Sequence, residues 1–182
     1  GPAGQGAATR VLLGVGGSIA AYKACIIVRE LVSRGAEVRC VMTKNAERFV
    51  SPLTLAALSR GPVCRDLFDP SQWEMAHLSL ASWAQRILVA PASADLLARL
   101  AQGRAGGPVE ACVLSAKVPV FVAPAMDSEM WEHPATRENA RRLEGYGYRL
   151  LGPVSGPLAS GRVGPGRLME PSEIVSRVLG PP

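Results

Sequence analysis

The chain has 182 residues, of which 48% are hydrophobic and 19% charged, and its formal net charge is +5. This length predicts one well-buried domain and is too short for two comfortable ones. The arginines are spread along the chain, which argues against a nucleic-acid-binding surface but suits an anionic ligand. The apolar runs are far shorter than the ~20 residues of a membrane span.

The four cysteines form no CxxC pair and the chain has two histidines, so no metal site is expected. Three of the cysteines, Cys25, Cys40 and Cys112, lie in apolar runs and are expected to be buried. The N-terminus lacks the basic and apolar segments of a signal peptide, which predicts a cytoplasmic protein. Residues 1–8, with a Gly1-Pro2 start typical of protease cleavage, are expected to be a disordered leader before a domain at 9–182.

Short apolar runs alternate with longer helical patterns along the chain. The segment 18–34 has the apolar spacing of an amphipathic helix, and Gly35 is a typical helix stop. Because this helix separates two apolar runs, the unit is βαβ, and we predict an α/β fold with a doubly wound parallel sheet. Residues 152–171, rich in glycine and proline, are expected to be a mobile loop. The expected strands are 11–15, 38–42, 87–90 and 118–123.

The end of the first expected strand is rich in glycine. Gly16 and Gly17 precede Ser18 at the start of the helix, where free N–H groups and the helix dipole favour a phosphate. The dinucleotide fingerprint is incomplete because Ile19 replaces its third glycine, and the second strand ends in Thr43 rather than an acidic residue. This pattern favours a mononucleotide over NAD. A glycine-rich turn without a ligand is the alternative.

Two further strands end in Ala-Pro followed by small or polar residues. The first gives Ser93 and Asp95, and the second gives Met126 and Asp127. Because parallel strands end at the same edge of a sheet, both turns can approach one flat ligand. Each polar residue is also a good helix N-cap, so a purely structural role stays open, as does a core position for Met126 and Met130.

Four segments in this order resemble the homo-oligomeric flavin-containing cysteine decarboxylases. They are residues 16–23, 91–95, 124–131 and 161–169, with support from 51–54 and 75–78. The family includes phosphopantothenoylcysteine decarboxylase and the lantibiotic-type peptidyl-cysteine decarboxylases. The resemblance implies a single Rossmann-like (flavodoxin-like) domain that forms trimers or dodecamers, with FMN at the contact between subunits.

The resemblance also implies roles for individual residues. His77 is the expected active-site histidine, reaching the flavin and substrate of a neighbouring subunit, and residues 152–171 contain a flap that closes on the substrate. The expected FMN-binding residues are Gly16, Gly17, Ser18, Ile19, Thr43, Ser93, Ala94, Asp95 and Met126. The expected catalytic residues are His77, Asp127 and Ser160, and the expected substrate contacts are Met130, Asp127 and Gly161.

Three positions depart from the family pattern. Asp127 stands where the family usually has Asn, and an ionised carboxylate cannot donate a hydrogen bond to a substrate carboxylate. Ser160 stands where many phosphopantothenoylcysteine decarboxylases have a cysteine that helps to return electrons from the reduced flavin to the ene-thiol. Gly106-Gly107-Pro108 replaces an acidic helix start, which puts the subunit contact there in doubt.

Decarboxylation of a cysteine needs an electron sink that protein side chains do not offer, and FMN supplies it. The absence of a flap thiol favours an enzyme that stops at the ene-thiol. We therefore expect oxidative decarboxylation of a peptide with a C-terminal cysteine. The alternatives are phosphopantothenoylcysteine decarboxylation in coenzyme A biosynthesis, where the bacterial enzymes often carry a fused ligase domain, and a flavin-binding regulatory module without activity.

Overall fold

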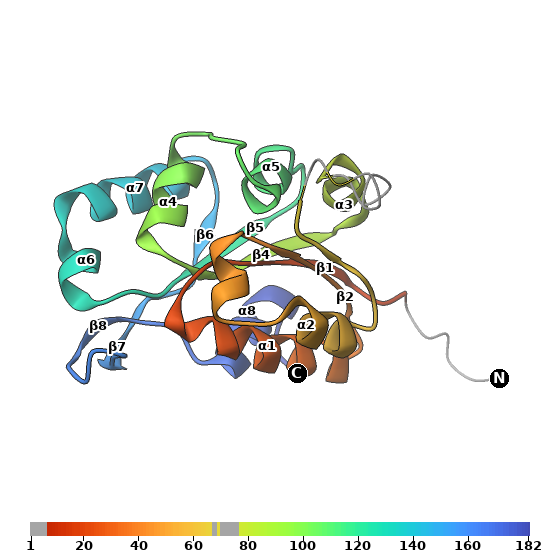
Figure 1. The fold of residues 1–182 in the computed structure, drawn as a ribbon, viewed down its shortest axis with the longest axis horizontal. Helices are drawn as coiled ribbons and strands as arrows, with labels where there is room; N and C mark the ends of the chain where they lie inside the picture. The colour runs from red at the N-terminus through yellow and green to blue at the C-terminus, as the bar shows by residue number, and fades with distance from the viewer. Residues whose placement is uncertain (1–6, 67–68, 70–76) are drawn as a thin grey trace.

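A central parallel sheet organises the molecule (Figure 1). The computed structural model describes residues 7–66, 69 and 77–182. The six strands follow the order β3-β2-β1-β4-β5-β6, and every neighbouring pair is parallel. This order is that of the doubly wound Rossmann fold, so the predicted fold class is confirmed. The strands are β1 (Arg10–Val15), β2 (Glu37–Met42), β3 (Val63–Cys64), β4 (Arg86–Ala92), β5 (Val120–Pro124) and β6 (Arg149–Leu150).

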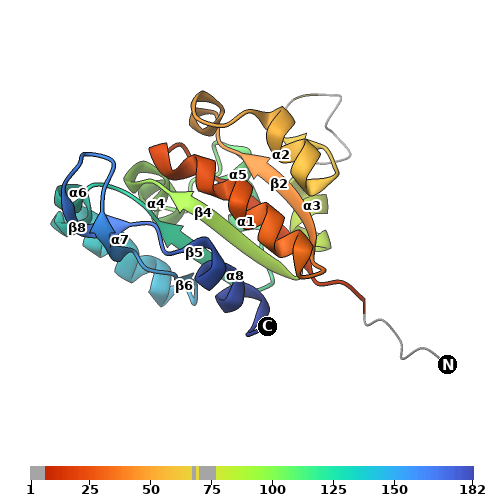
Figure 2. The same cartoon turned by 90° about the horizontal axis from the view of Figure 1, so that it is seen from below.

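Helices cover both faces of the sheet (Figures 1 and 2). One face packs against α1 (Tyr22–Ser33), α2 (Pro52–Ser59) and α8 (Pro171–Leu179). The other packs against α3 (His77–Trp83), α4 (Ala94–Ala101), α5 (Pro108–Leu114) and α7 (Pro134–Gly145). The shorter turns are η1 (Ile19–Ala21), η2 (Asn45–Arg48) and α6 (Ser128–Glu132). Within the described ranges, no helix is long and apolar enough to cross a bilayer.

The first βαβ unit follows from its sequence. Val11, Leu12 and Leu13 are each 0% exposed, because β1 lies in the middle of the sheet and both of its faces are covered. In the following helix the buried side chains recur at helical spacing, and Gly35 ends the turn with a φ of +86°. The first turn of this helical region is the 3₁₀ helix η1, which is capped by Ser18, and α1 follows it.

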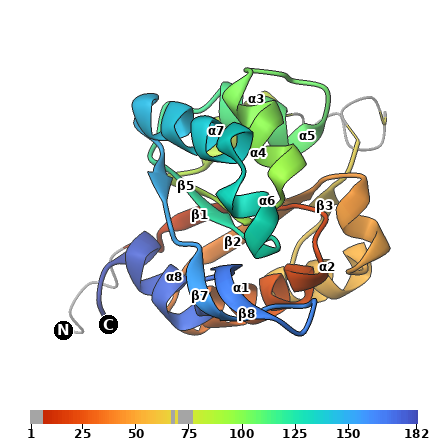
Figure 3. The ribbon, with the colours of Figure 1, turned by 90° about the vertical axis from the view of Figure 1, so that its left-hand side faces the viewer.

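The segment 152–171 contains a hairpin where we expected a loop. Strands β7 (Val154–Pro157) and β8 (Val163–Arg167) pair antiparallel. Because these strands are rich in glycine and proline, the sequence pattern did not predict them. The hairpin packs on the segment after β5, where the Met126 N–H donates to the Gly166 carbonyl at 2.9 Å. Figure 3, which faces this end of the molecule, shows the hairpin beside α6.

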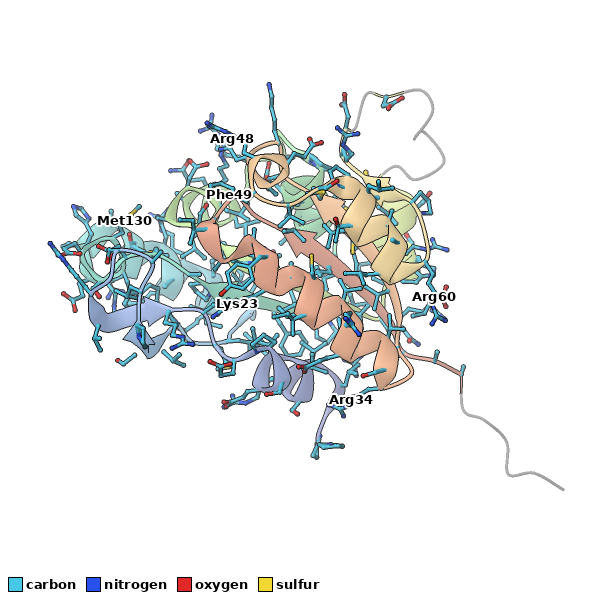
Figure 4. The ribbon with its side chains drawn as sticks, turned by 60° about the horizontal axis from the view of Figure 1, so that its bottom comes forward. Lys23, Arg34, Arg48, Phe49, Arg60 and Met130 are labelled. Carbon is cyan, nitrogen blue, oxygen red and sulfur yellow. The ribbon has the colours of Figure 1, made fainter. Side chains whose placement is uncertain are left out.

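Arg60 offers a direct test of helix termination. It is the C-cap of α2 and has a left-handed backbone, with φ +61° and ψ +35° (Figure 4). Glycine adopts this conformation without the steric cost of a Cβ. We expect Arg60→Gly to raise the free energy of unfolding by about 0.5–1 kcal/mol, measured by urea denaturation.

The matched control for Arg60 is Gln102, the C-cap of α4, whose φ of −88° suits any residue. Gln102→Gly should lower the free energy of unfolding because glycine gains entropy in the unfolded chain. Equal and destabilising effects of the two substitutions would contradict the assignment of strain to Arg60.

Candidate functional site

The carboxyl ends of β1 and β4 meet at the point where the strand order reverses, the usual ligand position in such sheets. The Gly16 N–H donates to the Pro91 carbonyl at 3.0 Å, which joins the loop after β1 to the end of β4. A Cβ on Gly16 would lie 2.5 Å from that same carbonyl oxygen. The contact between these two strand ends therefore requires glycine at position 16.

Gly17 brings the end of β2 into the same place. A Cβ at position 17 would lie 2.5 Å from the Cβ and 2.9 Å from the carbonyl carbon of Asn45. The glycine pair thus allows three strand ends to approach closely, with backbone exposed between them. This is the arrangement that a phosphate-binding loop needs.

Three hydroxyl groups at these strand ends are held in the same way. The Ser18 hydroxyl accepts from the Ala20 N–H at 3.1 Å and the Thr43 hydroxyl from the Ala46 N–H at 3.2 Å. The Ser93 hydroxyl accepts from the Leu96 N–H at 3.2 Å. Since each hydroxyl acts as an acceptor in its cap, its own proton stays available for an anion. The capping role and the ligand role are therefore compatible, and the donor set fits a phosphate.

Two cavities flank the glycine loop. The first has a volume of about 630 Å³, and Gly17, Thr43, Ser93 and Asp95 lie in its wall. The second has a volume of about 550 Å³, and its wall includes five more of the predicted residues. These are Ser18, Ile19, Met126, Asp127 and Ser160. Because Gly17 and Ser18 face different cavities, the loop that they share separates the two.

The remaining predicted residues lie elsewhere. Gly16 lies against the Pro91 carbonyl oxygen, and Ala94 is the first residue of α4. Met130 is 51% exposed on α6, and Gly161 stands in the turn of the hairpin with a φ of +87°; neither is among the described residues that line a cavity. His77 is the first residue of α3, but its side chain lies outside the described part of the structure, as do residues 1–6 of the expected leader.

Two of the unusual residues contact each other. The Ser160 hydroxyl donates to Oδ1 of Asp127 at 2.7 Å, across 33 positions of sequence. Asp127 occupies the N-cap position of α6, but its side chain caps no helix N–H, so the carboxylate is available to the hairpin. The next two residues also contact the hairpin, because Ser128 donates to the Pro165 carbonyl at 2.7 Å and Glu129 pairs with Arg162. These contacts attach the hairpin to the loop after β5.

Glu110 is a residue of the first cavity that sequence reasoning missed. It is 4% exposed in the first turn of α5, and its Oε2 lies 2.6 Å from the position of a Cβ on Gly107. The carboxylate accepts from the Gly107 N–H, so Glu110 supplies the acidic helix start that Gly106-Gly107-Pro108 lacks. The signal was a Glu three residues after a glycine N-cap. Burial raises the pKa of Glu110, and the nearby charge of Arg99 opposes this in part.

This raised pKa predicts a pH-dependent effect on stability. The folded protein holds the Glu110 proton more tightly than the unfolded chain, so the favourable contribution exists below the ordinary pKa of 4.5 and is lost as pH rises. Glu110→Gln should therefore increase the free energy of unfolding at pH 7, with a smaller gain near pH 4. Urea denaturation at several pH values measures the difference.

Glu138 is the matched control for Glu110, because Arg141 lowers the pKa of this exposed carboxyl. Glu138→Gln should bring no gain in stability at pH 7. A Glu110→Gln variant that is less stable than the parent at pH 7 would show that the ionised cap is worth more than its desolvation costs.

No cysteine stands among the described residues that line the cavities. Cys40 and Cys112 are buried as expected, and burial raises the pKa of each thiol to about 12. Cys25 is half-buried rather than fully buried, since one side of α1 faces solvent. Raised pKa values keep these thiols protonated, the opposite of what a reactive thiolate needs.

Comparisons with known proteins agree with this geometry. A family model described as Flavoprotein matches residues 4–181. The coenzyme A biosynthesis bifunctional protein CoaBC of Vibrio vulnificus is 46% identical over 171 residues, which cover 93% of this chain and 43% of that protein. The chain therefore spans less than half the length of the curated relatives it matches.

Two solved structures have nearly the same fold. A mutant PPC decarboxylase complexed with pantothenoylaminoethenethiol has a TM-score of 0.81 at 33% identity, covering 93% of this chain and 96% of that one. The FMN-dependent cysteine decarboxylase SpaF has a TM-score of 0.80 at 30% identity, covering 95% and 96%. Both similarities extend over nearly all of this chain.

Proposed function

The chain belongs to the flavoprotein family, and from this premise we propose that it binds FMN and decarboxylates phosphopantothenoylcysteine (PPC), a cysteine derivative with a free thiol. The observation that carries the proposal is that the Thr43 and Ser93 hydroxyls lie in the wall of one cavity with Gly17 of the glycine pair, a donor set that suits a phosphate. The 46% identity to CoaBC favours PPC over the peptide substrate suggested by Ser160.

In this proposal the first cavity binds the FMN phosphate and the second binds the substrate. The first offers Thr43 and Ser93 to the FMN phosphate, and Gly17 keeps the loop backbone close to it. The second would hold the cysteine end of the substrate, between Ile19 and the hairpin. When bound, FMN supplies the two-electron oxidation of the thiol that makes loss of CO₂ possible. His77 is our candidate for the group that takes up the thiol proton, because an imidazole is a common general base.

A peptide with a C-terminal cysteine is the second candidate substrate. Ser160 supports it, because the flap in this chain carries a hydroxyl where a thiol would help to complete the reduction to the saturated product. The 30% identity to SpaF, itself named as a cysteine decarboxylase, is compatible with it.

One assay separates these possibilities. FMN-loaded protein is incubated with PPC and, separately, with a peptide ending in cysteine, and the product masses are read. We expect PPC to lose about 44 Da as CO₂, or about 46 Da if the reaction stops at the ene-thiol. If only the peptide loses mass, the function is peptide modification and not PPC decarboxylation. Stable binding of FMN with no change in either substrate would indicate a regulatory module.

The phosphate site predicts a selective effect of Ser93. Ser93→Ala should lower the free energy of unfolding by about 1 kcal/mol through the lost N-cap, and weaken FMN binding about 10-fold through the lost donor. Ser51 caps α2 through the Leu53 N–H and lines neither cavity among the described residues, so Ser51→Ala is the matched control.

Fluorescence titration with FMN and urea denaturation measure the two effects of the serine substitutions. Ser51→Ala should match the stability loss of Ser93→Ala but leave the FMN dissociation constant unchanged. Equal FMN affinities of the two variants would remove Ser93 from the phosphate site.

We also propose that copies of the chain associate, and an exposed apolar stripe supports this. Ile19, Tyr22 and Ile26 are 61%, 58% and 42% exposed at helical spacing along η1 and α1. Leu53 on α2, which packs against α1, is also exposed, as is Phe49 after η2, which Figure 4 labels. Because Ile19 and Tyr22 also line the second cavity, a second copy covering the stripe would help to enclose the substrate. Sedimentation analysis gives the size of the assembly.

A further inference from the structure

The second cavity contains charges of both signs. Its described lining includes the carboxylate of Asp127 and two cationic side chains, Lys23 and Arg167. A cysteine carboxylate that enters this cavity needs hydrogen-bond donors and positive charge, since its transfer from water is costly otherwise. One of the groups that line the cavity must therefore bind the substrate carboxylate.

Asp127 is unsuited to that task. An ionised carboxylate has no hydrogen to donate, and it repels a second carboxylate at close range. Its Oδ1 already accepts the Ser160 hydroxyl at 2.7 Å. Asp127 thus has the wrong charge for this contact, and another donor is required.

Arg167 is held in a fixed position beside this loop. It ends β8, its side chain is 31% exposed, and one terminal nitrogen lies 3.1 Å from Oε1 of Glu170. Its Cδ and Nη1 lie 2.9 Å and 3.1 Å from the position of a Cβ on Gly156, so the missing side chain at 156 gives it room. Glu170 is its hydrogen-bond partner among the described residues, which leaves other N–H groups of the guanidinium for a ligand.

Lys23 is the weaker candidate for the same task. Its ammonium lies 6.0 Å from the ring centroid of the neighbouring Tyr22 on α1, and Figure 4 labels Lys23 there. A lysine presents a point charge on a flexible stem, whereas the planar fork of an arginine matches both oxygens of a carboxylate. The orientation imposed by Gly156 and Glu170 adds to this preference, because less freedom is lost on binding.

We propose that Arg167 binds the carboxylate of the cysteine substrate and that Asp127 does not. This inference rests on the proposed decarboxylase function, and it makes Arg167 a residue that selects substrates with a carboxylate on the carbon next to the thiol-bearing carbon. Arg167 was absent from the site predicted by sequence. Its role depends on the hairpin, which brings it to the same cavity as the loop after β5.

The test uses two ligands that differ by the carboxylate alone. These are S-methyl PPC and S-methyl phosphopantetheine, whose thioethers lack the thiol hydrogen that oxidation removes. Both are titrated by calorimetry into FMN-loaded protein and its Arg167→Gln variant. We expect the variant to bind S-methyl PPC about 10- to 100-fold more weakly and S-methyl phosphopantetheine with unchanged affinity. Arg167→Lys should recover part of the lost affinity.

Arg177→Gln is the matched control, because Arg177 forms an ion pair of the same 3.1 Å length with Glu173 and lines neither cavity among the described residues. Equal weakening of both ligands by Arg167→Gln would show that Arg167 acts on their shared part, such as the phosphate, and would overturn the proposal. Unchanged binding of both would do the same. Failure of the parent protein to bind either ligand, with FMN retained, would contradict the proposed function and this inference with it.

Discussion

Replacement of Gly16 by alanine is expected to yield a protein that retains almost no flavin. The new Cβ would lie 2.5 Å from the Pro91 carbonyl oxygen, which is backbone and cannot rotate away. The loop after β1 must then move from the end of β4 and break the 3.0 Å hydrogen bond between the Gly16 N–H and that oxygen. We expect a loss of about 1–3 kcal/mol in the free energy of unfolding, together with loss of the phosphate site.

The flavin-to-protein absorbance ratio after purification and reconstitution measures the effect of Gly16→Ala. Gly145→Ala is the control, since no described residue beyond its own helix turn lies within 4 Å of the added carbon at the end of α7. That variant should keep its flavin and be at least as stable as the parent. A Gly16→Ala protein with full FMN content would show that the loop does not depend on this contact.

Replacement of Gly166 by alanine should separate catalysis from flavin binding. The added Cβ would lie 2.2 Å from the Met126 carbonyl oxygen, and the φ of +122° is itself unfavourable for alanine. The hairpin must therefore lift from the loop after β5, and with it Ser160 leaves Asp127. Because displacement of about 1 Å in a site can cost 100-fold in rate, we expect kcat for PPC to fall about 100-fold or more, with FMN content unchanged.

Gly161→Ala is the matched control for Gly166→Ala. Its φ of +87° is also in the left-handed region, but apart from its chain neighbours no described residue lies within 4 Å of the added carbon. Backbone strain alone would lower kcat by the same factor in both variants, whereas loss of the contact with Met126 would affect Gly166→Ala far more. Loss of flavin in Gly166→Ala would show instead that the hairpin is needed to hold the cofactor.

The sequence predicted those parts of the fold that depend on local pattern. The four longer strands of the sheet and the first helix follow from apolar runs and helical spacing, and the observed bounds differ by only a few residues. Strands β3 and β6 were missed because two residues give no periodicity. The hairpin was missed because glycine and proline lack strand propensity, and it is stabilised by contacts with Met126 and Ser128 that sequence spacing does not show.

The candidate site divides in the same way. The glycine pair and the capping serines could be predicted because their chemistry is local to each strand end. The spacing of Glu110 from Gly107 signals a helix cap, but its burial at the first cavity could not be predicted. The position of Arg167 at the second cavity could not be predicted either, since that cavity is formed by distant segments. The substrate preference drawn from Ser160 alone gave too much weight to one position, whereas 46% identity over 171 residues favours the alternative.

The hydrogen bond between Ser160 and Asp127 has a consequence for sequence variation. These are the two side chains that we expected to depart from residues common in the family, and they contact each other at 2.7 Å. A cysteine at 160 would be a poorer donor to a carboxylate, and an amide at 127 would be a poorer acceptor for the hydroxyl. We therefore expect the two positions to have changed together during divergence, so that Asp with Ser, and Asn with Cys, recur as pairs among relatives more often than the mixed combinations do.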